Sequence, residues 1–209
     1  MNFIIGVVIS YLLGAIPTAY IWGKWHKGID IRQHGSGNVG ATNVFRVLGK
    51  GPGFAVLLID IVKGIIPVVF VADTLQLTAL WPRIILGIVA IVGHNWTVFL
   101  KFKGGKGVAT TLGVLIGLTI IVPSIRGLFF ITIISFFVTL VFSRYVSLSS
   151  IIASIVLPLL MALTSQPFEL TFMSVIFCVF VVIRHKANLG RILSGNESKV
   201  PMPFDNKNT

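Results

Sequence analysis

The sequence predicts an all-α integral membrane protein, a polytopic helix bundle with seven transmembrane helices. Hydrophobic residues make up 55% of the 209 residues and charged residues only 11%, and the mean hydropathy is +0.96. A water-soluble domain does not carry so apolar a composition on its surface. The apolar residues also fall in long runs separated by polar or glycine-rich loops, which is typical of repeated membrane spans.

Three apolar runs approach the roughly 20 residues that a helix needs to cross the hydrocarbon core. They are Phe3 to Trp22, Phe54 to Val71 and Leu80 to Phe99. The first lacks the basic start and small-residue cleavage site of a signal peptide, so we interpret it as a retained span. Four shorter runs complete the seven predicted spans: Val108 to Val122, Leu128 to Phe142, Leu148 to Leu163 and Phe168 to Ile183. Because these four are short, a five-span arrangement in which two of them form a re-entrant pair stays open.

The basic residues predict the orientation of the seven spans. Of the 17 Lys and Arg residues, Arg83 and Arg126 fall on one side and Lys63 lies inside a span, whereas all the others fall on the opposite side. By the positive-inside rule the richer side faces the cytoplasm. The sequence therefore predicts an N-terminus outside, a cytoplasmic C-terminus, and polar loops that put an active site on the cytoplasmic side of the membrane.

The net charge of +11 points to anionic lipids and phosphorylated substrates. Nucleic acid is not the expected partner, because the basic residues lie between apolar runs and not on a face with exposed aromatic side chains. Cys178 is the only cysteine, so no disulfide or cysteine metal site can form within one chain. The few carboxylates are scattered and none lies beside a histidine at ligand spacing, so we expect neither a metal nor a cofactor.

A basic, glycine-rich loop between the third and fourth predicted spans is the main candidate site. Gly104, Gly105 and Gly107 surround Lys106, and a predicted helix begins at Val108. Glycines let backbone N–H groups approach a ligand closely, and the positive end of a helix attracts an anion, so the loop predicts a phosphate site. It is not a P-loop, because no Ser or Thr follows the lysine. The alternative is a solvated basic loop that only sets the topology.

The first cytoplasmic loop carries a second polar motif. Its glycines spell G-x-G-x-x-G, but no strand precedes them, so we reject a dinucleotide site. What remains is a set of short hydroxyl and amide side chains with one arginine that can clamp an oxyanion: Ser36, Asn38, Thr42, Asn43 and Arg46. The alternative is a polar loop with a helix cap.

Polar residues within or near the spans are further candidates. Asp60 and Lys63 are three residues apart in the second span and can pair, either as a structural ion pair or in a substrate role. His94, near the cytoplasmic end of the third span, is either a buried hydrogen-bonding residue or a base. Ser143 opens a tight cytoplasmic turn, in which Ser147 serves equally well as a cap or a ligand.

The chain after the last span carries His185, Asn188 and Arg191 at intervals of three, which would form one polar stripe if the helix continues. The alternative is headgroup anchoring by basic side chains. We expect a single domain over residues 1–195 and a loose, polar cytoplasmic tail over residues 196–209.

Three segments in this order carry a family resemblance: Ser36 to Asn43 with Arg46; Gly93-His94 followed by Phe102 to Thr110; and Arg184-His185 with Asn188 and Arg191. Together they resemble the bacterial acyl-phosphate:glycerol-3-phosphate acyltransferases, the PlsY family, over nearly the whole chain. Leu189 departs from the expected Ile, and the tail from Lys199 matches nothing. The resemblance implies transfer of a fatty acyl group from acyl phosphate to the sn-1 hydroxyl of glycerol 3-phosphate, which gives lysophosphatidic acid in phospholipid biosynthesis.

The resemblance and the residue chemistry together predict the roles within the site. No Ser or Cys has a convincing His and carboxylate partner, so we expect direct attack without a covalent acyl-enzyme. The residues expected to be catalytic are Ser36, Lys106, His185 and Asn188. The residues expected to bind substrate are Gly37, Asn38, Thr42, Asn43, Arg46, His94, Gly104, Gly105, Gly107, Thr110 and Ser143. Membrane lipids are expected neighbours, and docking of a soluble enzyme that makes acyl phosphate is left open.

A non-catalytic protein is the competing prediction. A small anion transporter or a phosphate-binding membrane module would also place basic loops at a bilayer surface. A transport path would favour polar groups near the midplane and inverted repeats, and the sequence has no evident internal repeat. An enzyme is therefore the favoured interpretation.

Overall fold

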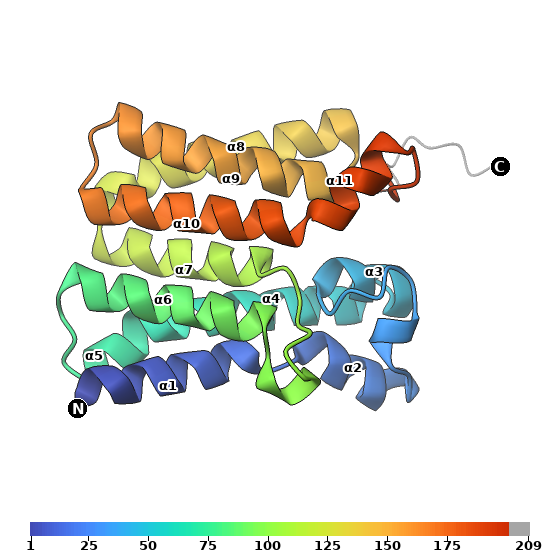
Figure 1. The fold of residues 1–209 in the computed structure, drawn as a ribbon, viewed down its shortest axis with the longest axis horizontal. Coiled ribbons are helices and arrows are strands. Elements are labelled where there is room, and N and C mark those ends of the chain that lie inside the picture. The colour runs from blue at the N-terminus through green and yellow to red at the C-terminus, as the bar shows by residue number, and fades with distance from the viewer. Residues whose placement is uncertain (201–209) are drawn as a thin grey trace.

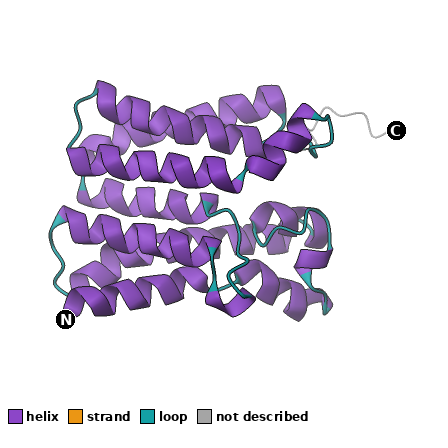
Figure 2. Cartoon of the chain, viewed as in Figure 1, coloured by secondary structure: helices purple, strands orange, loops and turns teal. Residues whose placement is uncertain are grey.

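The computed structural model describes residues 1–200, and these contain helices and no strands, as Figure 2 shows. The all-α prediction is confirmed for this part of the chain. In order, the elements are α1 (Asn2–Ala15), α2 (Thr18–Lys27), η1 (Ile31–Gln33), α3 (Ala41–Leu48), α4 (Lys50–Ile66), η2 (Pro67–Val71), α5 (Ala72–Thr74), α6 (Leu80–Asn95), η3 (Val98–Leu100), α7 (Val108–Ile121), η4 (Pro123–Ile125), α8 (Arg126–Ser143), α9 (Val146–Leu163), α10 (Phe168–Arg184) and α11 (Lys186–Leu193).

The long apolar helices lie side by side along one direction (Figure 1). Each predicted span coincides with a helical segment. Five segments among residues 1–200 are long and apolar enough to cross a membrane: Asn2–Lys27, Lys50–Thr74, Leu80–Leu100, Pro123–Ser143 and Val146–Leu163. The pair α10 and α11, bent by 55°, counts as a sixth if the two helices form one broken span, and α7 is a shorter apolar helix. The count of seven spans and the orientation of the termini stay predictions.

The first predicted span is not one straight helix. α1 ends at Ala15 and α2 begins at Thr18. Pro17 has no N–H to donate, and it disfavours helical geometry at Ile16, whose φ and ψ are −53° and 115°. The prediction of a continuous span from Phe3 to Trp22 therefore needs this correction, and the break leaves backbone groups that other side chains bind.

Helix contacts between α1 and α6 and between α4 and α7 depend on glycines at close approaches. A Cβ on Gly14 would lie 2.0 Å from the carbonyl oxygen of Ala90, and one on Gly113 would lie 1.9 Å from that of Ile61. Small residues at such crossings let helix backbones approach within a membrane, where van der Waals packing drives association. The main core lies between α6, α7, α9 and α10 and includes Phe177.

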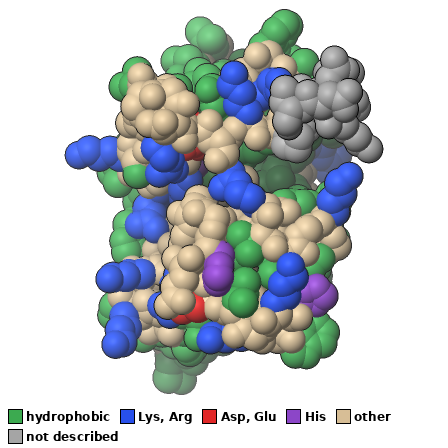
Figure 3. Space-filling view, turned by 90° about the vertical axis from the view of Figure 1, so that its right-hand side faces the viewer, with side chains coloured by type: hydrophobic (Ala, Val, Ile, Leu, Met, Phe, Trp, Pro, Cys, Tyr) green, Lys and Arg blue, Asp and Glu red, His purple; other side chains and the backbone are tan. Residues whose placement is uncertain are grey.

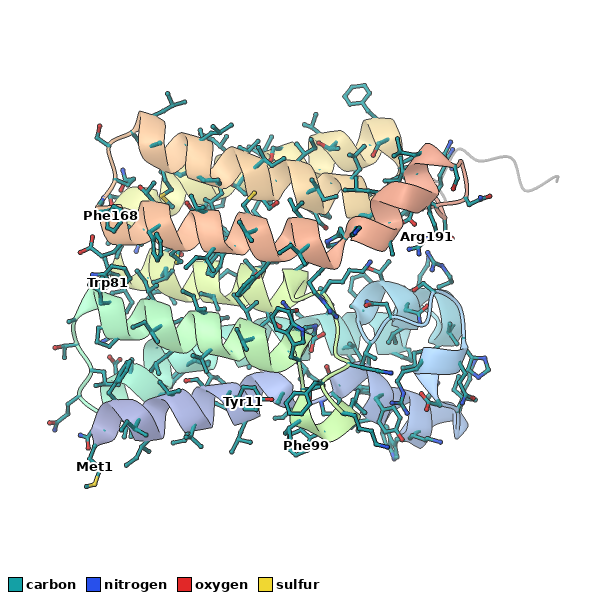
Figure 4. The ribbon with its side chains drawn as sticks, in the orientation of Figure 1. Met1, Tyr11, Trp81, Phe99, Phe168 and Arg191 are labelled. Carbon is teal, nitrogen blue, oxygen red and sulfur yellow. The ribbon has the colours of Figure 1, made fainter. Side chains whose placement is uncertain are left out.

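The outer surface is apolar, which suits a lipid environment. Large side chains on α8 such as Phe130, Ile134 and Phe137 are exposed, as expected where lipid replaces water. Met1, Trp81 and Phe168 lie at one end of the bundle and Arg191 at the other (Figure 4). Lys and Arg side chains gather on the end face that carries α2, α3 and α11 (Figure 3).

Candidate functional site

The glycine-rich loop connects η3 to α7 (Figure 1). It lies at the end of the bundle where Lys and Arg side chains gather, which we call the basic end. The amides of Gly104 and Gly105 donate to the carbonyl oxygens of Asn95 and His94, at 3.2 and 3.1 Å. On the other side, the Arg184 guanidinium donates to the carbonyl oxygens of Gly104 and Gly105, at 3.0 and 2.7 Å. The loop is thus held between α6 and α10. Because both glycine amides are already engaged, they are not available to a phosphate in this geometry.

Only glycine fits at positions 104 and 105. A Cβ on Gly105 would lie 2.2 Å from His94 Nε2 and 2.5 Å from the Val39 carbonyl oxygen, and one on Gly104 would lie 2.0 Å from the His94 carbonyl oxygen. Real Cβ contacts are never this short, so the loop reaches its position only without side chains here. The sequence predicted both glycines as phosphate-binding positions, whereas in the structure they have a packing role and their amides donate to the end of α6.

Lys106 lies next to the N-terminus of α7, as predicted. Gly107, with φ +76°, caps the helix. The Lys106 ammonium donates to Asn188 Oδ1 at 2.5 Å, which joins the glycine-rich loop to the segment after the last span. Burial lowers the pKa of Lys106 to about 8. The carboxylate of Glu197 opposes this shift, and nearby positive charges add to it: Arg191, Arg184 and Arg46.

Glu197 is the residue that the sequence analysis missed. Its carboxylate accepts hydrogen bonds from Asn188 Nδ2 at 2.6 Å, Ser147 Oγ at 2.8 Å and Arg191 Nε at 2.8 Å. Burial raises the pKa of Glu197, but these hydrogen bonds outweigh burial and lower it. The only signal in the sequence was one carboxylate close to the basic segment that follows the last span, in a chain with six acidic residues.

The segment around Glu197 is anchored by hydrogen bonds, although Asn196, Ser198 and Lys199 are exposed. Its carboxylate bonds hold it against α9 and α11, and the Val200 amide donates to the Arg144 carbonyl oxygen at 2.8 Å. The prediction of a loose tail is therefore wrong for residues 196–200, because a carboxylate with three polar partners ties the chain down. Residues 201–209 of that predicted tail lie outside the described residues.

His185 marks the bend between α10 and α11. The two helices meet at 55°, so the predicted straight stripe is interrupted at His185, whereas Asn188 and Arg191 share α11. The His185 ring is buried, and Nδ1 lies 2.7 Å from the Val181 carbonyl oxygen. Burial first, and then the charge of Lys106, lower the pKa of His185 to about 4. The imidazole is neutral at pH 7, and donation from Nδ1 leaves Nε2 as an acceptor.

The first loop is organised by Asn43. Its Oδ1 accepts from the Ser36 amide at 2.9 Å, and its Nδ2 donates to the carbonyl oxygens of Ile31 and His34 at 3.2 and 3.0 Å. Asn43 is buried and so shapes the loop. By contrast, Ser36, Thr42 and Arg46 are exposed at this end, and Gly37 and Asn38 are half-buried.

Three other predicted residues occupy different settings. His94 is buried, between Asp60 and Gly105. Thr110 is buried in α7, and its hydroxyl has no hydrogen-bond partner within residues 1–200. Ser143 ends α8, and its hydroxyl oxygen accepts from the Tyr145 amide at 3.2 Å. The structure thus joins Lys106 to Asn188 directly and places His94 against Gly105 of the loop. Thr110 is buried in the first turn of α7.

Known proteins resemble this chain over nearly its full length. Residues 4–195 match the family model described as glycerol-3-phosphate acyltransferase. The glycerol-3-phosphate acyltransferase of Halalkalibacterium halodurans is 45% identical over 201 residues, which cover 93% of this chain and 93% of the relative. That of Fusobacterium nucleatum is 44% identical over 199 residues, which cover 95% of this chain and 98% of the relative.

Two solved structures share the fold. Both are crystal structures of PlsY, an integral membrane glycerol 3-phosphate acyltransferase. The glycerol 3-phosphate form has a TM-score of 0.85 and 36% identity and covers 96% of both chains. The lysophosphatidic acid form has a TM-score of 0.82 and 35% identity, with the same coverage. The resemblance seen in the sequence is confirmed: the chain is an integral membrane protein and belongs to the glycerol-3-phosphate acyltransferase family.

Proposed function

We propose that this protein transfers a fatty acyl group from an acyl phosphate to the sn-1 hydroxyl of glycerol 3-phosphate, at the cytoplasmic face of a bacterial cell membrane. The products are lysophosphatidic acid and inorganic phosphate. Family membership supports the acceptor and the reaction type. The donor, the mechanism and the side of the membrane rest on the residues at the basic end.

One observation carries the proposal: Lys106, half-buried at the start of α7, donates to Asn188 Oδ1 at 2.5 Å. A cation beside a helix N-terminus binds a phosphate dianion strongly where water is limited. Both proposed substrates carry phosphate, so this end needs two such sites. Lys106 and Arg46, which is close enough to affect the pKa of Lys106, supply one cation for each.

We assign the two phosphates to different groups. Lys106, the Lys106 and Gly107 amides and Ser36 hold the acyl phosphate, and Arg46 with Ser143 clamps glycerol 3-phosphate. Asn38, Gly37 and Thr42 line the first loop beside them. Asn43 keeps that loop in shape, as its three hydrogen bonds indicate. The acyl chain enters between helices from the bilayer.

The chemistry is direct attack. The hydroxyl oxygen of glycerol 3-phosphate bonds to the acyl carbonyl carbon, and the bond between that carbon and the bridging phosphate oxygen breaks. The hydroxyl proton passes to an oxygen of the departing phosphate, so no strong protein base is needed. His185, with a pKa of about 4, is a weak base at pH 7 and orients the hydroxyl with Asn188. Lys106 stabilises charge on the leaving phosphate.

The test is whether the reaction depends on both the acyl phosphate donor and the glycerol 3-phosphate acceptor. Purified protein receives palmitoyl phosphate with and without glycerol 3-phosphate, and palmitoyl-CoA serves as the control donor. We expect phosphate release that requires the acceptor, and lysophosphatidic acid, identified by mass, from the acyl phosphate alone. Product from palmitoyl-CoA would overturn the assigned donor. No reaction from folded protein would favour an anion transporter or a phosphate-binding module instead.

A further inference from the structure

Four polar side chains meet inside the bundle beneath the glycine-rich loop. Asp60 and Lys63 in α4 are 1% and 4% exposed, and Lys63 Nζ lies 2.9 Å from Asp60 Oδ1. The Thr18 hydroxyl donates to the same carboxylate oxygen, and His94 Nδ1 lies 3.9 Å from it. Ionised groups within a membrane span are costly even when paired, so this cluster calls for a role beyond packing.

The cluster fixes the break between α1 and α2. Lys63 donates to the carbonyl oxygen of Ile16 at 3.0 Å, the residue whose backbone Pro17 turns out of the helix. Thr18, the first residue of α2, is bound to Asp60. The ion pair therefore ties both sides of the break to α4. The start of α2 is held in place beside the glycine-rich loop.

His94 connects the polar cluster to the glycine-rich loop. One edge of its ring faces Asp60, and its Nε2 lies against Gly105, 2.2 Å from where a Cβ would be. Its backbone carbonyl accepts from the Gly105 amide at 3.1 Å. A cavity of about 10 Å³ is lined by Thr18, His94, Gly104 and Gly105 among others. The polar cluster and the loop thus adjoin each other directly.

We propose that Asp60 and Lys63 are positioning residues for acyl transfer. The ion pair lies against the His94 ring, the ring supports Gly105 from below, and Arg184 clamps the same residue from the side. Lys106 is the next residue, so its ammonium and the N-terminus of α7 are held where a phosphate is received. The kinetic part of this inference rests on the proposed function, and the structural part does not.

A second ion pair, with one buried member, provides a control. Arg83 in α6 pairs with Asp73 and donates to the Val68 carbonyl oxygen at 2.9 Å. It is buried like Lys63 and belongs to the same helix as His94, but it lies at the first turn of α6, whereas His94 lies at the last. Breaking this pair lowers stability without touching the loop. Arg83 is the buried member of its pair, whereas Asp73 is exposed. The control therefore shows what the loss of a buried cation and its ion pair does at a site away from the loop.

The first experiment is hydrogen exchange, which needs no substrate. In Asp60→Asn, we expect amides in residues 102–107 to exchange at least about tenfold faster than in wild type, whereas Arg83→Met leaves them unchanged. Thr18→Val removes one hydroxyl at similar volume and serves if Asp60→Asn does not fold. It should speed the same amides. Unchanged exchange in folded Asp60→Asn or Thr18→Val overturns the proposal.

The second experiment is steady-state kinetics on the same proteins. We expect kcat of Asp60→Asn and of His94→Gln to fall about tenfold or more, because small displacements of a positioned group are costly. kcat of Arg83→Met should stay near that of wild type. The double variant should be no slower than the worse single one, since both act through one chain of contacts. Full kcat with a lowered midpoint, or multiplied losses, overturns the proposal.

The two readouts separate two failures. Wild-type protein that consumes no acyl phosphate would contradict the proposed function, and the exchange experiment would still decide whether the cluster positions the loop. Active wild type with unaltered exchange and full kcat in the variants would contradict the positioning role alone.

Discussion

Lys106 is the residue on which the proposed chemistry depends most. Its ammonium is both a hydrogen-bond donor to Asn188 and the group whose pKa burial lowers to about 8. Ordinary lysines stay charged well above pH 9. This lysine loses its charge within an accessible range of pH, so its role can be read from a pH profile.

The pH dependence of kcat/KM for acyl phosphate should show that loss. The protonated form of Lys106 binds phosphate, and protonation falls as pH rises through about 8, so kcat/KM should fall on the alkaline side from about that pH. kcat/KM reports the free enzyme, in which no phosphate raises the pKa. Lys106→Arg should move the alkaline fall upward by more than one pH unit, because arginine stays charged. A profile flat to pH 9.5 contradicts this role.

The sequence identified several residues of the site but not the contacts that they make. The glycines, the lysine and the polar residues of the first loop could be identified from their types and spacing. The hydrogen bonds that engage the Gly104 and Gly105 amides could not, because they depend on how α6 ends beside the loop. Glu197 was passed over for the same reason, since its three partners are contributed by α9 and α11.

At the scale of elements, close packing at glycines holds together the helices that position the site. α4 carries Asp60 and Lys63, α7 begins beside Lys106, and the two cross at Gly113. An apolar run in the sequence predicts a span but does not say which face meets which neighbour. The break at Pro17 follows from proline chemistry, yet what fills the break depends on α4.

A pair of Gly→Ala variants tests this packing. Gly113→Ala would put its Cβ 1.9 Å from the Ile61 carbonyl oxygen, whereas nothing lies within 4 Å of a Cβ on Gly127. Thermal unfolding in one detergent should show Gly113→Ala destabilised by about 1 to 3 kcal/mol. Gly127→Ala, in α8, should be neutral or slightly more stable, because alanine favours helix. Equal midpoints for the two variants would contradict the tight crossing of α4 and α7.

At the scale of the whole molecule, the sequence predicted the helix positions and the basic end well. Hydropathy and the distribution of Lys and Arg are averages over many residues, so they survive local irregularities. The number of spans stays a prediction, because it depends on two local features, the shortness of α7 and the bend between α10 and α11 at His185. The family relationship rests on similarity over nearly the whole chain and not on these averages.

The predicted orientation can be tested by labelling intact cells. In a Cys178→Ala background, Thr78→Cys lies in the loop before α6 and Lys186→Cys at the start of α11, and both native residues are exposed. A membrane-impermeant maleimide should label Thr78→Cys in intact cells, and Lys186→Cys only after the cells are opened. The reverse pattern would invert the predicted topology, and labelling of both in intact cells would mean an even number of crossings between them.

The central claim is that Lys106 at the basic end stabilises the phosphate during acyl transfer, and the most direct measurement compares two lysines of one loop. Lys106 is partly enclosed and bonded to Asn188, whereas Lys103 is exposed. With palmitoyl phosphate and glycerol 3-phosphate, kcat/KM of Lys106→Met should fall about 10²- to 10³-fold, the usual loss of a positioned charge-stabilising donor. Lys103→Met should stay within about threefold of wild type. Near-normal kcat/KM in folded Lys106→Met would contradict the account.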